Sequence, residues 1–238
     1  MFRIRRQDTG KSQTVEHSFP DRVAQQFEAY RSQFAAVNDA VREIASEAGE
    51  QQLGSYALVV GDDTSGRLPA LILRQIINRI RVRSGAPKVP ILFIQTNSGL
   101  SDNQDPLEAA WARRAGIWKG LAGQRALVVT EYIQTGRHLA QLSNLLGNAS
   151  IPFDVATLGS DGLDAQVKDT ARVPEGTRIF DGKGGLLLYR ETQLTGLSSE
   201  KCREPKREHV PMDAVAAARL HVRTIAEKVD QRLQEGLC

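Results

Sequence analysis

The sequence has few of the features that mark secreted or membrane-spanning proteins. Only two of its 238 residues are cysteines, Cys202 and Cys238, which is too few for a disulfide framework, so we expect free thiols. No apolar run approaches the roughly 18 residues that a membrane span needs. The basic N-terminus, MFRIRRQDTGKSQ, continues into polar residues and not into the apolar stretch of a secretory signal. We therefore expect a cytoplasmic protein without membrane association.

Aromatic residues are also scarce, at 5%, and the net charge is only +3. Lysine and arginine gather at 3–6, 79–83 and 201–207, but no aromatic residues interleave with them to stack bases, which argues against nucleic-acid binding. The histidines at 17, 209 and 221 have no Cys or His partner at ligand spacing, so no zinc site is predicted. With 41% hydrophobic residues, the chain has the composition of a soluble globular protein with a sizeable core.

Short apolar runs alternate with helical patterns in the central part of the chain. The runs are rich in β-branched residues and span 56–61, 89–96, 125–131 and 151–159, whereas the helical patterns span 68–82, 106–118 and 139–147. This alternation predicts an α/β fold with a parallel sheet flanked by helices. Because crossovers in such sheets are right-handed, the loops that follow the strands share one edge, where ligands bind.

The flanking segments have simpler patterns. An apolar stripe from Val23 to Ile44 predicts a long helix over 21–48, closed by Gly49, that either packs on the core or pairs two subunits as a homodimer. Residues 178–190 are typical of a β-hairpin across Asp181 to Gly185, and 211–233 of a C-terminal helix. The chain thus divides into a tail and long helix (1–54), a core (55–170), and a hairpin with the C-terminal helix (171–238).

The loop after the first predicted strand reads GDDTSGR, residues 61–67. Gly61 and Gly66 have the spacing of a P-loop, but Arg67 replaces its lysine and Leu68 replaces its magnesium-binding hydroxyl. The two side chains with which a P-loop binds a triphosphate and its magnesium ion are therefore absent. The alternative is an ordinary turn that places Asp62 and a second acid near a helix N-terminus, where acids are favoured.

The loop after the third predicted strand is more specific. The strand stops at Glu131, and Gln134-Thr135-Gly136-Arg137 then leads into a helix, which aims backbone N–H groups at a point suited to a phosphate. Gly136 permits close approach or a positive φ, and Glu131 can accept hydrogen bonds from sugar hydroxyls. An ordinary capped helix start fits the spacing equally well.

These two loops resemble those of a known family. LVVTEYIQTGRHL, residues 127–139, resembles the phosphoribosyl pyrophosphate motif of type I phosphoribosyltransferases, in which four apolar residues, two acids and a Thr-Gly turn build the 5′-phosphate loop. YALVVGDDTSGRLPALIL, residues 56–73, is similar to the family's pyrophosphate loop, with Gly66 and Pro69 in matching places. The polar NSGLSDNQDP, residues 97–106, corresponds to its mobile lid. The resemblance implies a phosphoribosyltransferase-like core, with a hood formed by the N- and C-terminal segments.

The resemblance also implies roles for individual residues. Glu131 would contact the ribose hydroxyls and assist magnesium placement, and Gln134 stands where some purine enzymes carry a proposed base. Thr130 replaces the first acid of the motif, and His138 replaces a phosphate-binding hydroxyl. The implied phosphate loop comprises Thr130, Thr135, Gly136, Arg137 and His138, and the implied pyrophosphate loop comprises Asp63, Thr64, Ser65, Gly66 and Arg67.

The activity implied by the resemblance is a glycosyltransferase reaction of nucleotide metabolism. The protein would bind phosphoribosyl pyrophosphate with Mg²⁺ and transfer ribose 5-phosphate to a nucleobase or related nitrogen nucleophile. The alternative is a catalytically silent relative that senses this ligand or serves as a scaffold, which the loss of an acid at Thr130 favours. The sequence assigns no residue as a direct metal ligand.

Overall fold

The computed structural model describes residues 19–62, 66–94, 120–162, 165–184, 197–198, 206–207 and 212–236. The predicted helix at 106–118, the predicted lid at 97–106, and Asp63, Thr64 and Ser65 lie outside these ranges. Across the described ranges, no helix has both the length and the apolarity needed to cross a membrane.

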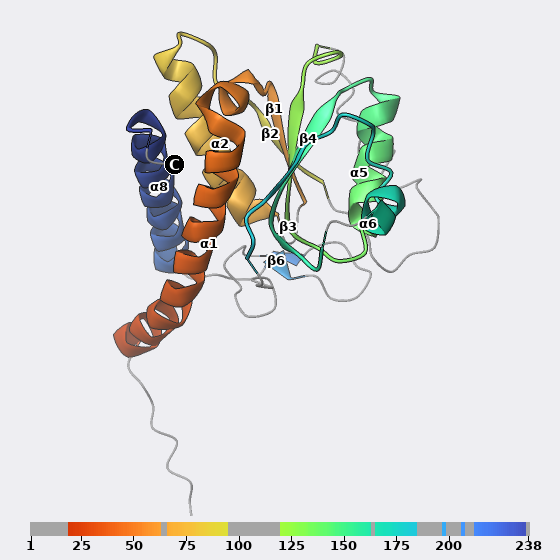
Figure 1. The fold of residues 1–238 in the computed structure, drawn as a ribbon. Coiled ribbons are helices and arrows are strands. Elements are labelled where there is room, and N and C mark those ends of the chain that lie inside the picture. Colours follow the sequence, from red (N-terminus) through yellow and green to blue (C-terminus); the bar gives the residue numbers. More distant parts are fainter. Residues whose placement is uncertain are drawn as a thin grey trace, which may run out of the picture.

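Five parallel strands form the central sheet, in the order β2-β1-β3-β4-β5 (Figure 1). The four predicted strands are confirmed, and a fifth joins them: β1 (Leu58–Asp62), β2 (Ile91–Ile94), β3 (Ala126–Ile133), β4 (Phe153–Ser160) and β5 (Ile179–Asp181). A separate antiparallel pair joins β6 (Leu197–Ser198) to β7 (Lys206–Arg207).

Helices cover both faces of the sheet, which confirms the α/β class. Figure 1 shows α1 (Phe19–Ser55), α2 (Arg67–Arg83) and α8 (Met212–Gln234) on one face, and α5 (Arg137–Asn148) with the short α6 (Ala165–Thr170) on the other. Two apolar clusters fill the layers, and β3 contributes to both: Leu127 and Val129 point toward α1, α2 and α8, whereas Ala126 and Val128 point toward α5. Burial on both faces explains why the strands read as continuous apolar runs.

The long N-terminal helix packs on the core. Val37, Val41 and Ile44 from its predicted stripe are completely or almost completely buried, beside residues of α2, α8 and the sheet. Gly49 has φ 72° and ψ 162°, so the predicted helix end is a kink, after which α1 continues to Ser55. The side chains of residues 19–34 are not among those described, and the homodimer stays a prediction.

The segment predicted as a hairpin contributes a strand to the main sheet. Residues 179–181 form β5, which pairs in parallel with Val155 to Thr157 of β4 and so covers an edge that would otherwise expose unpaired backbone groups. A second arm would fall at 185–190, outside the described residues.

The basic cluster at 79–83 ties helices together instead of facing a partner. Arg83 Nη1 donates to both carboxylate oxygens of Asp230 of α8, at 2.7 Å each, and Arg83 Nη2 donates to Glu50 of α1 at 2.7 Å. Arg79 pairs with Glu227 of α8. These contacts fix three helices on one face of the sheet.

A buried carboxylate lies at the amino-terminal edge of the sheet. Asp154 of β4 is fully buried and accepts hydrogen bonds from the Tyr56 hydroxyl at 2.8 Å, Gln52 Nε2 at 3.0 Å, Arg125 at 2.8 Å and the Arg178 backbone N–H at 3.0 Å. Burial raises the pKa of the Tyr56 phenol far above its ordinary value. Because Asp154 is fully hydrogen-bonded at the edge opposite the loops that follow β1 and β3, we assign it a structural role.

Candidate functional site

The order of the strands places a topological switch point between β1 and β3, and the region outside the carboxyl ends of these two strands is called the crevice. From β1 the chain crosses to β2 on one side, and β3 then pairs with the other side of β1, so the direction of winding reverses at this point. In open parallel sheets, ligands bind outside the carboxyl ends of the strands at such a switch point. The two loops singled out in the sequence follow β1 and β3, so the fold brings them to the same crevice.

Gly66 begins α2 and closes the first loop onto β3. A Cβ atom at this position would lie 2.3 Å from the backbone oxygen of Val129 and 2.9 Å from the backbone nitrogen of Asp62, so only glycine fits. Among the described residues, no side chain caps the N-terminus of α2, and its first turn contains no acid. The backbone of the pyrophosphate-loop candidate therefore lies directly against the strand that carries the phosphate-loop candidate.

Gly136 begins α5 in a left-handed conformation. Its φ of 73° and ψ of −4° belong to the region that glycine adopts without strain. A Cβ atom would also lie 2.8 Å from the backbone oxygen of Val167 in α6. Within the described residues, α5 likewise starts without a capping side chain and without an acid in its first turn. The positive φ expected at Gly136 is therefore found, and the close contact at this glycine is with α6.

Exposure changes steeply along the second loop. Gln134, Thr135 and Arg137 are exposed, whereas Thr130 is 7% exposed and Glu131 is fully buried. The backbone oxygen of Glu131 is 3.3 Å from Thr157 Oγ1, which donates to it. The turn can therefore meet a ligand directly. Thr130 and Glu131 lie within β3, which continues to Ile133, so the predicted end of the strand at Glu131 is wrong by two residues.

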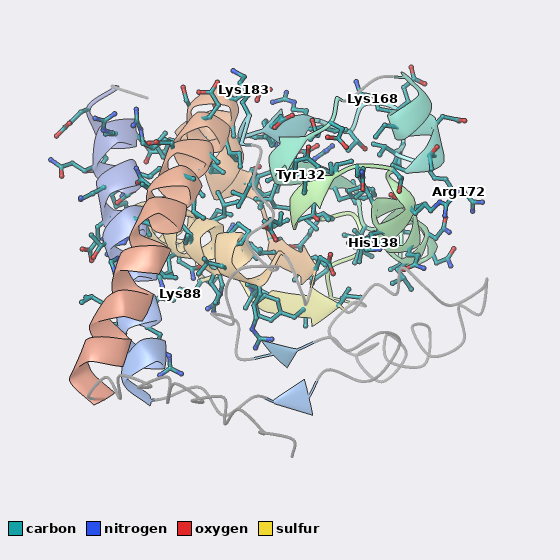
Figure 2. All side chains as sticks on the ribbon, turned by 90° about the horizontal axis from the view of Figure 1, so that it is seen from below. Lys88, Tyr132, His138, Lys168, Arg172 and Lys183 are labelled. Atoms are coloured by element: carbon teal, nitrogen blue, oxygen red, sulfur yellow. The ribbon has the colours of Figure 1, made fainter. Side chains whose placement is uncertain are left out.

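Asp62 lies beside His138, although the sequence-based assignment of site residues did not include it. It is the last residue of β1, only 3% exposed, and its Oδ2 lies 3.9 Å from Nδ1 of His138 in the first turn of α5. Figure 2 looks onto this edge of the sheet and shows His138 at the near end of α5. The sequence does show that Asp62 stands at the end of a strand. It does not show that β1 and β3 are neighbours, which is what brings Asp62 close to the start of α5.

The guanidinium group of Arg67, the first residue of α2, packs against an aromatic ring. Its guanidinium carbon lies 4.5 Å from the ring centroid of Phe93 on β2, a favourable cation–π geometry. Gly61 makes room for that ring, because a Cβ there would lie 2.9 Å from two of the Phe93 ring atoms. The pyrophosphate-loop arginine is therefore oriented at the carboxyl ends of β1 and β2.

A second polar group lies at the ends of β3, β4 and β5. The Tyr132 hydroxyl donates to Asp161, which raises the pKa of that phenol, and Ser160 Oγ donates to Asp181 at 2.6 Å. Lys183 pairs with Glu43 of α1, so this end of the sheet is tied to the N-terminal helix (Figure 2).

The described residues contain no group of three or more His, Cys, Asp or Glu side chains that could enclose a metal ion. Magnesium, however, commonly binds through one or two carboxylates together with phosphate oxygens of a ligand and water. The carboxylate of Asp62, at the end of β1, fits that small set of protein donors, whereas Glu131 points to the opposite face of the sheet with Val129.

The fold and the site define an α/β protein with a parallel sheet and two glycine-started helices meeting at its switch point. The sequence matches no family model, and no curated protein is similar to it in sequence. Among solved structures, the chain resembles a hypothetical protein from Neisseria gonorrhoeae with bound ppGpp, with a TM-score of 0.41 and 19% identity, over 63% of this chain and 76% of that one. This distant likeness carries no inference about function.

Proposed function

We propose that the chain binds phosphoribosyl pyrophosphate across the crevice between β1 and β3. The observation that supports this most is the pair of glycine-started helices, α2 and α5, one on each side of the switch point. The N–H groups of a first helical turn and the positive end of the helix dipole both favour an anion. A ligand with a phosphate at one end and a pyrophosphate at the other suits two such helix starts better than a ligand with one anionic group.

Each part of the ligand has a candidate partner. The exposed turn of Gln134, Thr135, Gly136, Arg137 and His138 would hold the 5′-phosphate, and Gly66 with Arg67 would hold the pyrophosphate. Glu131, which is buried on the other face of β3, would meet the ribose hydroxyls only after this part of the strand rearranges. Magnesium, held by a carboxylate of the crevice and by ligand oxygens, would supply charge neutralisation for the pyrophosphate.

With an acceptor present, the reaction would transfer ribose 5-phosphate to a nitrogen nucleophile such as a nucleobase. The bond between the anomeric carbon and the pyrophosphate oxygen breaks, the bond to the acceptor nitrogen forms, and pyrophosphate leaves. The protein would contribute by positioning the reactants and by aiming N–H groups and Arg67 at the charge that develops on the pyrophosphate.

A second candidate function is ligand sensing or scaffolding without catalysis. It is favoured by Thr130, which offers a hydroxyl where the resembled motif has an acid, and by the complete burial of Glu131. Both candidates share the same binding site, so binding and turnover must be measured separately.

Calorimetric titrations with phosphoribosyl pyrophosphate, ribose 5-phosphate and pyrophosphate, with and without Mg²⁺, test the binding proposal. We expect the complete ligand to bind more tightly than either half. Arg137→Ala should weaken ribose 5-phosphate binding about tenfold or more, because a hydrogen bond to a charged group contributes about 1.5–3 kcal/mol. The matched control is Arg223→Ala, which removes an exposed arginine from α8 on the opposite face.

No binding of any of the three ligands at millimolar concentration would overturn the proposal. If the wild-type protein binds the complete ligand, a nucleobase screen for pyrophosphate release separates the two candidates. Release with at least one base supports the transferase, whereas binding without release across the screen supports the sensor or scaffold.

A further inference from the structure

Polar side chains from three different elements lie on the α5 face of the sheet, close to the start of α5. The last registered pair between β1 and β3 is Gly61 with Val129, so Asp62 and Thr130 are the next residues on each strand. Because side chains alternate along strands, Asp62 and Thr130 point to the same face as Val60 and Val128, which pack toward α5. His138 approaches from the start of α5, with Nδ1 3.9 Å from Asp62 Oδ2.

The side chains of Thr130 and Asp62, which stand side by side on neighbouring strands, differ in charge. Thr130 brings a neutral hydroxyl, and Asp62, one strand away, brings a carboxylate. Neighbouring strands lie only about 4.8 Å apart, so a carboxylate at the end of β1 can meet the same ligand atoms as one at the end of β3. Both side chains are nearly buried, at 3% and 7% exposure, which holds them in place before a ligand arrives.

We propose that Asp62 supplies the carboxylate that is absent at Thr130 and accepts a hydrogen bond from a ribose hydroxyl. The inference rests on the proposed function and deepens it. The carboxylate then comes from β1 and stands beside Thr130, whereas Glu131, the next residue of β3, points to the opposite face with Val129. His138 keeps the Asp62 carboxylate oriented toward the crevice through the contact of its Nδ1.

If Asp62 takes the place of an acid at position 130, an aspartate introduced at position 130 should compensate for the loss of Asp62. We expect Asp62→Asn to weaken binding of ribose 5-phosphate about tenfold, because a neutral acceptor forms a weaker hydrogen bond than a charged one. Adding Thr130→Asp to Asp62→Asn should restore most of the affinity, whereas Thr130→Asp alone should not improve it, since two adjacent carboxylates repel each other. Inorganic pyrophosphate has no hydroxyl groups of a sugar, so without Mg²⁺ it should lose no affinity on Asp62→Asn, which removes a negative charge beside the anion.

The measurement is calorimetric titration of the four proteins, with the fold checked by circular dichroism and urea unfolding. The matched control is Asp161→Asn, which removes a carboxylate from the end of β4, farther from the crevice, and should leave ribose 5-phosphate affinity unchanged. If Asp62→Asn does not fold, Asp62→Ser with and without Thr130→Asp provides the same comparison.

The outcomes separate the two proposals. If the wild-type protein binds neither ribose 5-phosphate nor phosphoribosyl pyrophosphate, the proposed function is wrong. If the wild type binds and Asp62→Asn binds equally well, or Thr130→Asp fails to rescue it, the role of Asp62 alone is overturned. If neither Asp62 variant folds, Asp62 is structural and the inference is likewise wrong.

Discussion

Alanine in place of Gly136 should destabilise the protein, whereas alanine in place of Gly147 should stabilise it. Gly136, at the start of the helix, has φ 73°, a conformation that costs an L-residue about 1–2 kcal/mol. Its Cβ would also lie 2.8 Å from the Val167 backbone oxygen, so α6 must shift. Gly147, near the end of the helix, has no atom within 4 Å of the place that a Cβ would occupy, and alanine there should gain about 0.5–1 kcal/mol.

Thermal and urea unfolding of Gly136→Ala, Gly147→Ala and the wild-type protein measure the difference. For a domain of this size, about 1 kcal/mol corresponds to a change in Tm of about 2–4 °C. We expect Gly136→Ala to lower Tm by about 2–8 °C and Gly147→Ala to raise it by about 1–4 °C. Gly136→Ala should also bind inorganic phosphate more weakly, because the displaced turn no longer presents its N–H groups together.

The reasoning would be refuted if Gly136→Ala were as stable as the wild type or if both substitutions shifted Tm in the same direction. Either result would mean that the turn before α5 adopts a conformation open to any residue. The close approach of α6 would then give no reason for glycine at position 136.

Three further results are expected. Asp154→Ala should destabilise the protein by about 1–3 kcal/mol or more in urea unfolding, since it leaves the buried Tyr56 hydroxyl and the donors of Gln52 and Arg178 without their acceptor, and a loss below about 1 kcal/mol would contradict the structural role. Folding raises the pKa of Tyr56, so its contribution to stability is complete below the ordinary tyrosine pKa of about 10 and is lost as pH rises above it. Above that pH, the wild-type protein should therefore lose more stability than Tyr56→Phe in unfolding experiments. Equal losses of stability in the two proteins would exclude this. Phe93→Leu should weaken pyrophosphate binding about two- to fivefold through loss of the cation–π contact while ribose 5-phosphate affinity stays constant, and an equal loss for both ligands would point to general unfolding of the site.

The sequence predicted the central architecture because its signals there are local. The strands that became β1 to β4 are short apolar runs, and α2 and α5 carry regular apolar faces, so each element could be recognised from its own residues. Gly136 was recognised for the same reason, because a Thr-Gly turn between a strand and a helix restricts the backbone locally.

Features that depend on distant partners were not predictable in this way. The segment of β5 has three strand residues, and only its pairing with β4 distinguishes a sheet strand from one arm of a hairpin. The relation between Asp62 and Thr130 requires the neighbour order of β1 and β3, which no spacing in the sequence records. The burial of Glu131 likewise depends on packing around the strand end.

The position of α8 has a consequence for how the protein is made. Val222, Ile225 and Val229 of α8 complete the apolar layer over α1 and α2, yet this helix follows every strand of the main sheet along the chain. During translation, that layer therefore stays open to solvent until the ribosome has released α8, long after the strands have emerged. We expect the nascent chain to depend on a holding chaperone during this interval, and an α8 peptide added separately to reassemble with a chain that ends before it.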